Sequence, residues 1–206
     1  VPQALVWTIG LMGIGRSVEN VLARLGEPTN DIVRFCFDGS IELIRDKPAH
    51  KVMMALAVFA ADASRAALGQ VANLSTFDRD DGLSDLERLS LVNKRDDRFS
   101  YLPLTKVFAE DELKRQPDFA ASARQLWLAY LLDLYQEAGT AYYWRYSNFG
   151  FFEASEELFA AIDWSFQQSA KENALNIFRL TYAACEFLEY QGDWNRLVEI
   201  AERSLQ

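Results

Sequence analysis

Histidine and cysteine are scarce in this chain, which has one histidine and two cysteines among its 206 residues. Cys36 and Cys185 lie far apart and match neither a disulfide framework nor a metal motif, which is typical of a reducing compartment. His50 stands beside Lys51 with no other metal-ligand pattern around it, so we expect a lone surface or interface histidine. A Ser-His-Asp or Cys-His catalytic set is excluded.

Phosphate-binding and calcium-binding motifs are also missing. The glycine cluster Gly10–Gly15 has no Lys-Ser/Thr pair in register and no strand before it, so we interpret it as a helix end and turn. Asp78, Asp80 and Asp81 lie close together, but this segment lacks the glycine and the terminal glutamate of an EF-hand. We interpret it as a solvated turn. We therefore expect no catalytic residues and no metal site.

Long apolar runs are absent as well. The longest, Ala4–Ile14, is interrupted by Thr8, Gly10 and Gly13. It is too short to span a bilayer, and it lacks the basic leader and cleavage site of a signal peptide. Half of all residues are hydrophobic, which argues against disorder over most of the chain. We expect an ordered cytoplasmic protein with no membrane partner.

The apolar residues that are present recur mostly at helical spacing and predict a mainly α fold. Between Lys51 and Leu113 they indicate three helices, a polar tip, a short alternating strand and a further helix that Pro103 opens. The predicted segments are Val52–Phe59, Ala63–Asn73, Gly82–Val92 and Arg98–Leu102. Three helices followed by a small hairpin are typical of a winged helix.

The charges of this winged helix argue against DNA binding. From Phe77 to Leu91 the reading helix and its lead-in carry five acidic and two basic residues, and the whole chain has a formal net charge of −9. DNA affinity rests on Lys and Arg side chains that neutralise phosphates. Lys94, Arg95 and Arg98 form the only basic cluster in this segment, and two aspartates lie among them. We therefore interpret the winged helix as a packing module.

Further helices are predicted on both sides of the winged helix. Those before it are Pro2–Met12, Ser17–Gly26 and a segment from Asn30 to Ile44 with an expected break at Gly39. Those after it are Leu104–Lys114, Phe119–Ala138, Glu153–Ala170, Asn173–Tyr190 and Trp194–Leu205. The expected domains are a small helical bundle at 1–46, a winged-helix domain with a short β-hairpin at 47–115, and a linker helix with TPR-like α-α repeats at 116–206.

One junction near the C-terminus favours the repeat interpretation. Within Glu189–Trp194, Gly192 fits the end of one helix and Asp193 fits the N-cap of the next, as in a tetratricopeptide repeat. A generic helical hairpin is the alternative. On the linker helix we expect Trp127 to be buried between the winged helix and the repeats.

In order, these segments resemble the regulatory half of a STAND-class, NB-ARC-like switch ATPase. Val1–Leu5 resembles the Gly-x-Pro-Leu-Ala-Leu motif that follows the nucleotide-binding domain. Leu56–Phe59, Leu83–Val92 and Arg98–Leu104 resemble the winged helix of that family in order and spacing. The resemblance covers almost the whole chain, and the missing initial Met fits the expectation of a piece cut from a larger protein.

The resemblance implies a nucleotide switch in signal transduction. In this family the helical bundle and winged helix close over ADP, with Pro2 at the position that packs on the adenine. An unknown protein or ligand sensed by the repeats opens the clamp, ATP replaces ADP, and the protein self-oligomerises. The implied cofactor is thus ATP/ADP, held with an upstream nucleotide-binding domain. Leu102 stands where the family commonly has a phosphate-contacting His, and a leucine cannot donate that hydrogen bond.

The alternative function is a winged-helix/TPR transcriptional regulator that acts through DNA or through a partner protein. The acidic reading helix favours the switch over the regulator. A phosphate loop upstream of Val1 would distinguish the two.

Overall fold

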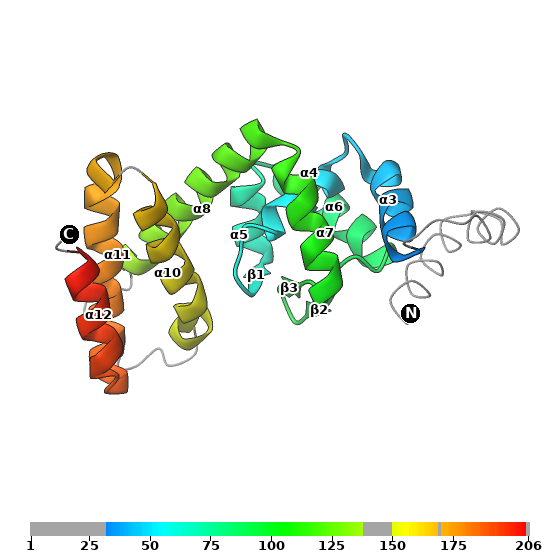
Figure 1. Cartoon of the computed structure of the whole chain (residues 1–206). Helices are drawn as coiled ribbons and strands as arrows, with labels where there is room; N and C mark the ends of the chain where they lie inside the picture. The colour runs from blue at the N-terminus through cyan, green and yellow to red at the C-terminus, as the bar shows by residue number, and fades with distance from the viewer. Residues whose placement is uncertain (1–31, 138–149, 169, 205–206) are drawn as a thin grey trace, which may run out of the picture. The chain divides into compact units, whose positions relative to one another are not determined.

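The computed structural model describes residues 32–137, 150–168 and 170–204 (Figure 1). These residues are mainly helical with one small sheet, which confirms the predicted mainly α class. The helices are α3 (Ile32–Ile44), α4 (Pro48–Leu56), α5 (Arg65–Val71), α6 (Thr76–Arg88), α7 (Pro103–Lys114), α8 (Pro117–Glu137), α10 (Gly150–Gln167), α11 (Ala170–Gln191) and α12 (Trp194–Ser204). The strands are β1 (Asp62–Ser64), β2 (Asn93–Arg95) and β3 (Arg98–Ser100). The helices expected at Pro2–Met12 and Ser17–Gly26 lie outside the described residues.

The chain divides into two compact units between Trp127 and Leu128. Among the described residues, the first unit holds α3 to α7, the sheet and the first part of α8. The second unit holds the rest of α8 together with α10, α11 and α12. The division therefore falls inside a continuous helix, beyond the sequence-based boundary at 115/116.

Helix α4 is the centre of the first unit. Seven of its nine residues are buried, because the helix packs against α3, α5, α6 and α7. Pro48 occupies the first helical turn, where its fixed φ suits the helix. Gly82 lets α6 approach closely, since a Cβ added there would lie 3.0 Å from the backbone nitrogen of Ala49. Each fully buried Leu, Val or Met contributes about 1.5–3 kcal/mol relative to an exposed side chain.

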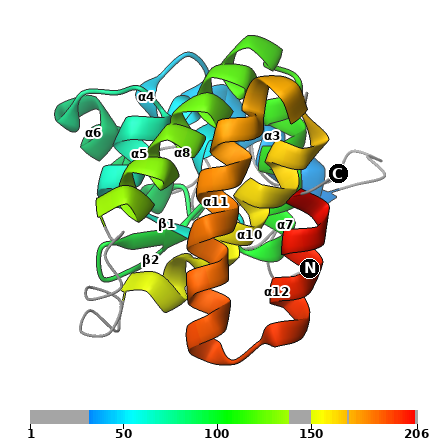
Figure 2. The same ribbon diagram turned by 90° about the vertical axis from the view of Figure 1, so that its left-hand side faces the viewer.

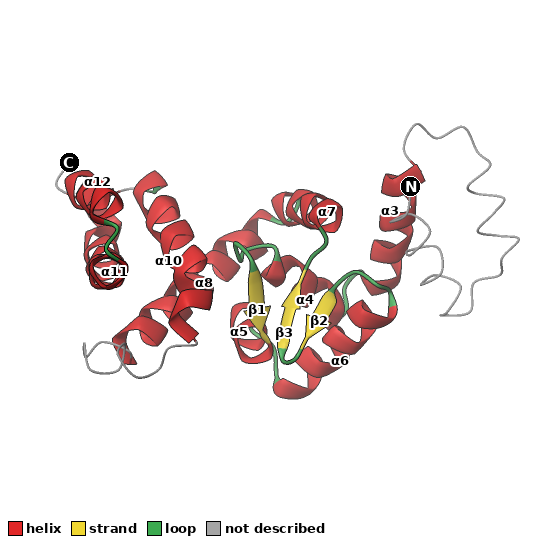
Figure 3. Cartoon of the chain, turned by 90° about the horizontal axis from the view of Figure 1, so that it is seen from below, coloured by secondary structure: helices red, strands yellow, loops and turns green. Residues whose placement is uncertain are grey.

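The sheet is antiparallel with the strand order β1-β3-β2 (Figure 3). Its central residue, Phe99, pairs with Ala63 on one side and Lys94 on the other, and its side chain is fully buried. The sequence predicted the β2–β3 hairpin but not β1, where it placed the start of a helix at Ala63. That helix, α5, instead begins at Arg65, because the hydroxyl of Ser64 accepts a hydrogen bond from the backbone N–H of Ala67 and caps it.

Helix α6 begins six residues earlier than the sequence predicted. The Ser75 hydroxyl accepts a hydrogen bond from the backbone N–H of Asp78 at 3.1 Å and caps the helix there. The segment that contains Asp78, Asp80 and Asp81 is therefore helical, and its interpretation as a solvated turn is wrong. Carboxylates in the first turn are favoured by the helix dipole, so an acidic stretch can open a helix as well as form a loop.

Helix α3 runs through Gly39 without the expected break. A glycine inside a helix costs about 1 kcal/mol relative to alanine. The burial of Phe37, Ile41 and Ile44 outweighs that cost, and the ring of Phe37 packs 5.1 Å from that of Phe108 on α7.

Helix α7 begins at Pro103, as predicted, and polar contacts join it to the chain around α4. The hydroxyl of Tyr101 donates to the carbonyl of Met53. The ammonium of Lys106 donates to the carbonyls of Phe59, at 3.2 Å, and Ala60. Burial, together with the nearby charge of Glu110, raises the pKa of Tyr101 well above its ordinary value, so the hydroxyl stays a donor.

The second unit is built from helices α10, α11 and α12, each packed on the next (Figure 2). The turn between α11 and α12 has the predicted features: Gly192 adopts φ 76°, and the Asp193 carboxylate accepts a hydrogen bond from the backbone N–H of Arg196 at 3.3 Å. Within the described residues, no helix is long and apolar enough to cross a membrane.

The side chain of Trp127 is buried, with 1% of its surface exposed. Its expected place between the winged helix and the repeats stays a prediction. We predict that Trp127→Ala lowers the free energy of unfolding by about 3–5 kcal/mol, because it removes a large buried side chain and leaves a cavity. Trp194→Ala is the matched control, since Trp194 is 58% exposed, and we expect it to cost less than about 1 kcal/mol. Urea denaturation measures both, and equal losses would contradict the prediction.

Candidate functional site

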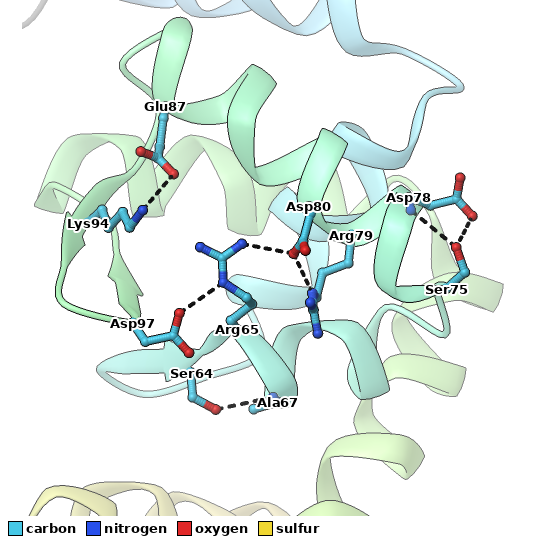
Figure 4. A network of polar contacts seen from close by, with 10 residues as sticks. All are labelled: Ser64, Arg65, Ala67, Ser75, Asp78, Arg79, Asp80, Glu87, Lys94 and Asp97. Carbon is cyan, nitrogen blue, oxygen red and sulfur yellow. Dashed lines mark hydrogen bonds and ion pairs between the residues drawn. The ribbon is translucent and has the colours of Figure 1, made fainter.

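The strongest concentration of interacting charges in the described residues lies where α5, α6 and the β2–β3 hairpin meet (Figure 4). Helix α6 supplies most of the negative charge. Its first turn, capped by Ser75, also forms a hydrogen bond from the Ser75 hydroxyl to the Asp78 carboxylate at 2.7 Å. We call this set of charged residues on α5, α6 and the hairpin the ion-paired face.

Arg65 joins all three elements of the ion-paired face. It is the first residue of α5, and its Nη1 donates to Asp80 on α6 at 2.8 Å. Its Nε donates to Asp97 in the hairpin turn at 2.9 Å, and its backbone N–H donates to the Asp97 carbonyl at 3.1 Å. The guanidinium also lies 5.4 Å from the centre of the Phe99 ring, within cation–π range. Arg65 therefore fixes the hairpin against both helices.

The pKa values of Asp80 and Arg65 shift in the directions expected when two opposite charges stabilise each other. Hydrogen bonds from Arg79, at 2.8 Å, and from Arg65 lower the pKa of Asp80 from 3.8 to about 2. Hydrogen bonds to Asp97 and Asp80 raise the pKa of Arg65. Both shifts favour the charged forms, and the ion pairs are partly open to solvent, so each contributes modestly to stability.

All but one of the remaining basic residues near the hairpin are also paired within the described part of the chain. Lys94 lies 3.9 Å from Glu87 on α6, and its ammonium is 5.9 Å from the centre of the Phe99 ring. Arg98 donates from Nε to Asp62 on β1 at 2.8 Å. On α6, Arg88 pairs with Asp85 at 2.6 Å. In the part of the chain that the structure describes, Arg95 has no ion-pair partner.

This pairing limits what the ion-paired face can bind. A phosphate approaching Arg65 or Lys94 must compete with a carboxylate that is already in place, and the helix behind it carries further negative charge. The face is thus poorly suited to a polyanion. Its ion pairs join α5, α6 and the hairpin to one another.

A second polar cluster centres on a buried His–Glu pair inside the first unit. The Nε2 atom of His50 lies 3.2 Å from Oε1 of Glu112, and both side chains are almost fully buried. Arg115 donates from Nη1 to Oε2 of the same carboxylate at 3.2 Å, and Arg45 lies 3.7 Å away. Removing one partner of a buried hydrogen bond typically costs about 1–3 kcal/mol, because the other partner is left unsatisfied.

The expectation for His50 was a lone surface or interface histidine, and the surface alternative is wrong because the side chain is buried against Glu112. His50 occupies the third residue of α4, on the same face as Met53 and Met54, which are buried. That apolar spacing was the signal for burial, but nothing near His50 in the sequence indicated Glu112 as its partner, 62 residues away. Among the described residues, no group of three or more His, Cys, Asp or Glu side chains is placed to hold a metal ion.

The two residues that the family resemblance singles out are not brought together by any described contact. Pro2 lies outside the described residues. Leu102 is the half-buried N-cap residue of α7; its side chain makes no capping hydrogen bond, while its carbonyl accepts one from the backbone N–H of Lys106 at 3.0 Å. A leucine offers a nucleotide phosphate no hydrogen bond from its side chain.

Comparison with known proteins found no match of the chain to any family model, to any curated protein or to any solved structure.

The low pKa of Asp80 predicts a pH-dependent contribution to stability. Because the folded-state pKa of about 2 lies below the ordinary value of 3.8, the ion pairs stabilise the fold above pH 3.8, and this stabilisation is lost as the pH falls toward 2. We expect the Tm of the unsubstituted chain to exceed that of Asp80→Asn near neutral pH, by a difference that shrinks through this window. Differential scanning calorimetry between neutral pH and pH 2 measures it.

Asp81→Asn is the matched control for this prediction, because Asp81 is exposed on the same helix and forms no ion pair with a described residue. Its Tm difference from the unsubstituted chain should stay flat over the same pH range. An Asp80→Asn curve parallel to that of Asp81→Asn would contradict the assignment.

Proposed function

We propose that α4 to β3 form a winged helix that serves as a packing module in a STAND-class switch ATPase. The observation that carries the proposal is the order of the elements: helix, strand, helix, helix and hairpin, with the three strands arranged β1-β3-β2. This order is typical of winged helices. A fold does not by itself define a function, so the charges on its surface decide between the uses of such a domain.

The ion-paired face favours packing over DNA reading. In a DNA-binding winged helix, the second helix of the helix-helix pair and the hairpin present free basic residues to phosphates. Here the corresponding helix α6 is acidic, and Arg65, Lys94 and Arg98 are neutralised by Asp80, Glu87 and Asp62. These ion pairs support the switch rather than the alternative transcriptional regulator.

The helices of the second unit support a role as a repeat-like sensor. Arg196 on α12 lies over the Phe159 ring of α10, at 3.6 Å from its centre, and Arg203 lies over Phe166 at 4.7 Å. Both contacts join positions 37 residues apart, so α12 lies beside α10 and runs in the same direction. Successive helix pairs in a helical repeat are related in this way.

In the proposed switch, the winged helix contributes to a closed state that holds ADP against a nucleotide-binding domain. ADP shifts the equilibrium only to the extent that it binds the closed state more tightly than the open one. Pro2 would pack on the adenine. Leu102 at the start of α7 would meet the phosphate side without a hydrogen bond, so packing would hold the closed state. ATP in place of ADP would favour opening and self-oligomerisation.

The proposal is tested on a longer polypeptide that contains both the proposed nucleotide-binding domain and this chain. We expect it to purify with about one ADP per chain, measured by chromatography of the denatured protein. We expect Leu102→His to slow the release of a fluorescent ADP analogue, because the imidazole N–H can donate to a phosphate. Leu102→Phe is the control for ring size and should not slow release. Absence of bound nucleotide, together with no effect of Leu102→His, would refute the proposal. The chain by itself should hydrolyse no ATP.

A DNA titration separates the two uses of the winged helix. We predict that the chain binds no DNA duplex at physiological salt, because the phosphates must compete with Asp80 and Glu87 for the basic side chains. The variant with Asp80→Asn, Asp85→Asn and Glu87→Gln should gain weak, salt-sensitive binding. Fluorescence anisotropy with a labelled duplex measures both. Sub-micromolar affinity of the unsubstituted chain would favour the transcriptional regulator.

A further inference from the structure

Helix α12 carries an apolar stripe that no described element covers. Trp194 and Val198 are 58% and 52% exposed. They lie four residues apart, and Glu202 follows at the same spacing, so the three side chains lie along one line of the helix surface. Leu197 and Ala201 beside them are half-exposed. We call Trp194, Leu197, Val198 and Ala201 the α12 stripe.

The second unit itself shows how such a stripe is covered. Helix α10 carries Leu158 and Ile162 at the same four-residue spacing, and both are fully buried. The helix that packs most extensively against α10 is α11. A helical partner is therefore the natural occupant of the α12 stripe, because the flanking helices present ridges and grooves rather than a sheet edge.

The charges around the stripe define the chemistry of that partner. Residues 128–206 contain twelve acidic and five basic residues, a net charge of −7 out of −9 for the whole chain. The two basic residues of α12 face α10, where Arg203 pairs with Asp163 at 2.8 Å and Arg196 lies over Phe159. Glu199 and Glu202 are exposed and form no ion pair with a described residue.

From this combination of an open apolar stripe and surrounding unpaired carboxylates, we propose that α12 is the docking site for an amphipathic helix of a protein partner with Lys or Arg beside its apolar face. A second copy of this chain fits poorly, because it would bring Glu199 and Glu202 against another acidic surface. An anionic lipid surface or a nucleic acid is disfavoured for the same reason. This proposal rests on the proposed function, in which the second unit is the sensor, and it adds the chemistry of the partner. Its test requires no nucleotide.

The experiment uses the purified chain and a fluorescein-labelled synthetic peptide of about 18 residues, long enough to form a helix. The peptide has one Leu/Ala face flanked by Lys, and anisotropy measures its binding. Two further peptides serve as controls: one has Glu in place of Lys, and one has the same composition in a scrambled order that removes the apolar face. We expect the basic amphipathic peptide to bind at least tenfold more tightly than either control.

Matched variants locate the binding surface. Trp194→Ala with Val198→Ser removes the centre of the stripe, and we expect at least tenfold weaker binding because buried Trp contacts dominate such interfaces. Phe178→Ser on α11 is the control, since Phe178 is 66% exposed but lies outside the stripe, and it should change binding less than twofold. Circular dichroism melts check that both variants remain folded.

Several results would overturn the proposal. One is failure of the basic amphipathic peptide to bind. Another is equally tight binding of the scrambled peptide, which would show that charge attraction alone drives binding. If Phe178→Ser weakened binding as much as the stripe variant, the binding surface would lie on α11. If light scattering showed a dimer that the stripe variant abolished, the occupant of the stripe would be a second copy of this chain. A nucleotide-free chain that binds the peptide as expected supports the docking site even if no ADP is found in the longer polypeptide.

Discussion

Burial of most of α4 is the constraint on which the first unit depends. A nine-residue helix is marginal in water by propensity alone, so tertiary packing must stabilise it. Because seven of its residues are buried, α3, α5, α6 and α7 have to surround it. Gly82 permits the close approach of α6. Lys106 donates to backbone carbonyls of the segment after α4. Tyr101 adds a second hydrogen bond to the carbonyl of Met53, which already accepts one from the backbone N–H of Ala57.

Enclosure of α4 also determines which charges remain on the surface and which are paired. With α5 and α6 packed around the same helix, Arg65 reaches both Asp80 and the turn of the hairpin. Except for Arg95, the basic side chains at the hairpin and at the start of α5 pair with carboxylates of the same unit. The low pKa of Asp80 and the raised pKa of Arg65 have this common cause. The same geometry holds the hairpin in place.

The two units differ in how their surfaces are employed. In the first, opposite charges are nearly balanced and largely paired across α5, α6 and the hairpin. In the second, acidic residues dominate, and the two arginines of α12 bind the ring faces of α10. An apolar stripe left open on an acidic unit is informative because charge selects among the partners that could cover it.

The sequence by itself determined the helical class, the β2–β3 hairpin, the start of α7 at Pro103 and the turn at Gly192 and Asp193. Each of these depends on local periodicity, on a fixed φ, or on a cap within a few residues. Only the tertiary structure decided the rest. Strand β1 is three residues long and exists because β3 lies beside it. The start of α6 has a local signal in the Ser75 cap, but its packing on α4 through Gly82 appears only in the folded unit. His50 is buried because Glu112, distant in sequence, meets it inside the fold. Pairings between distant residues leave no periodic trace in the sequence, since the energy that selects them appears only when the chain is compact.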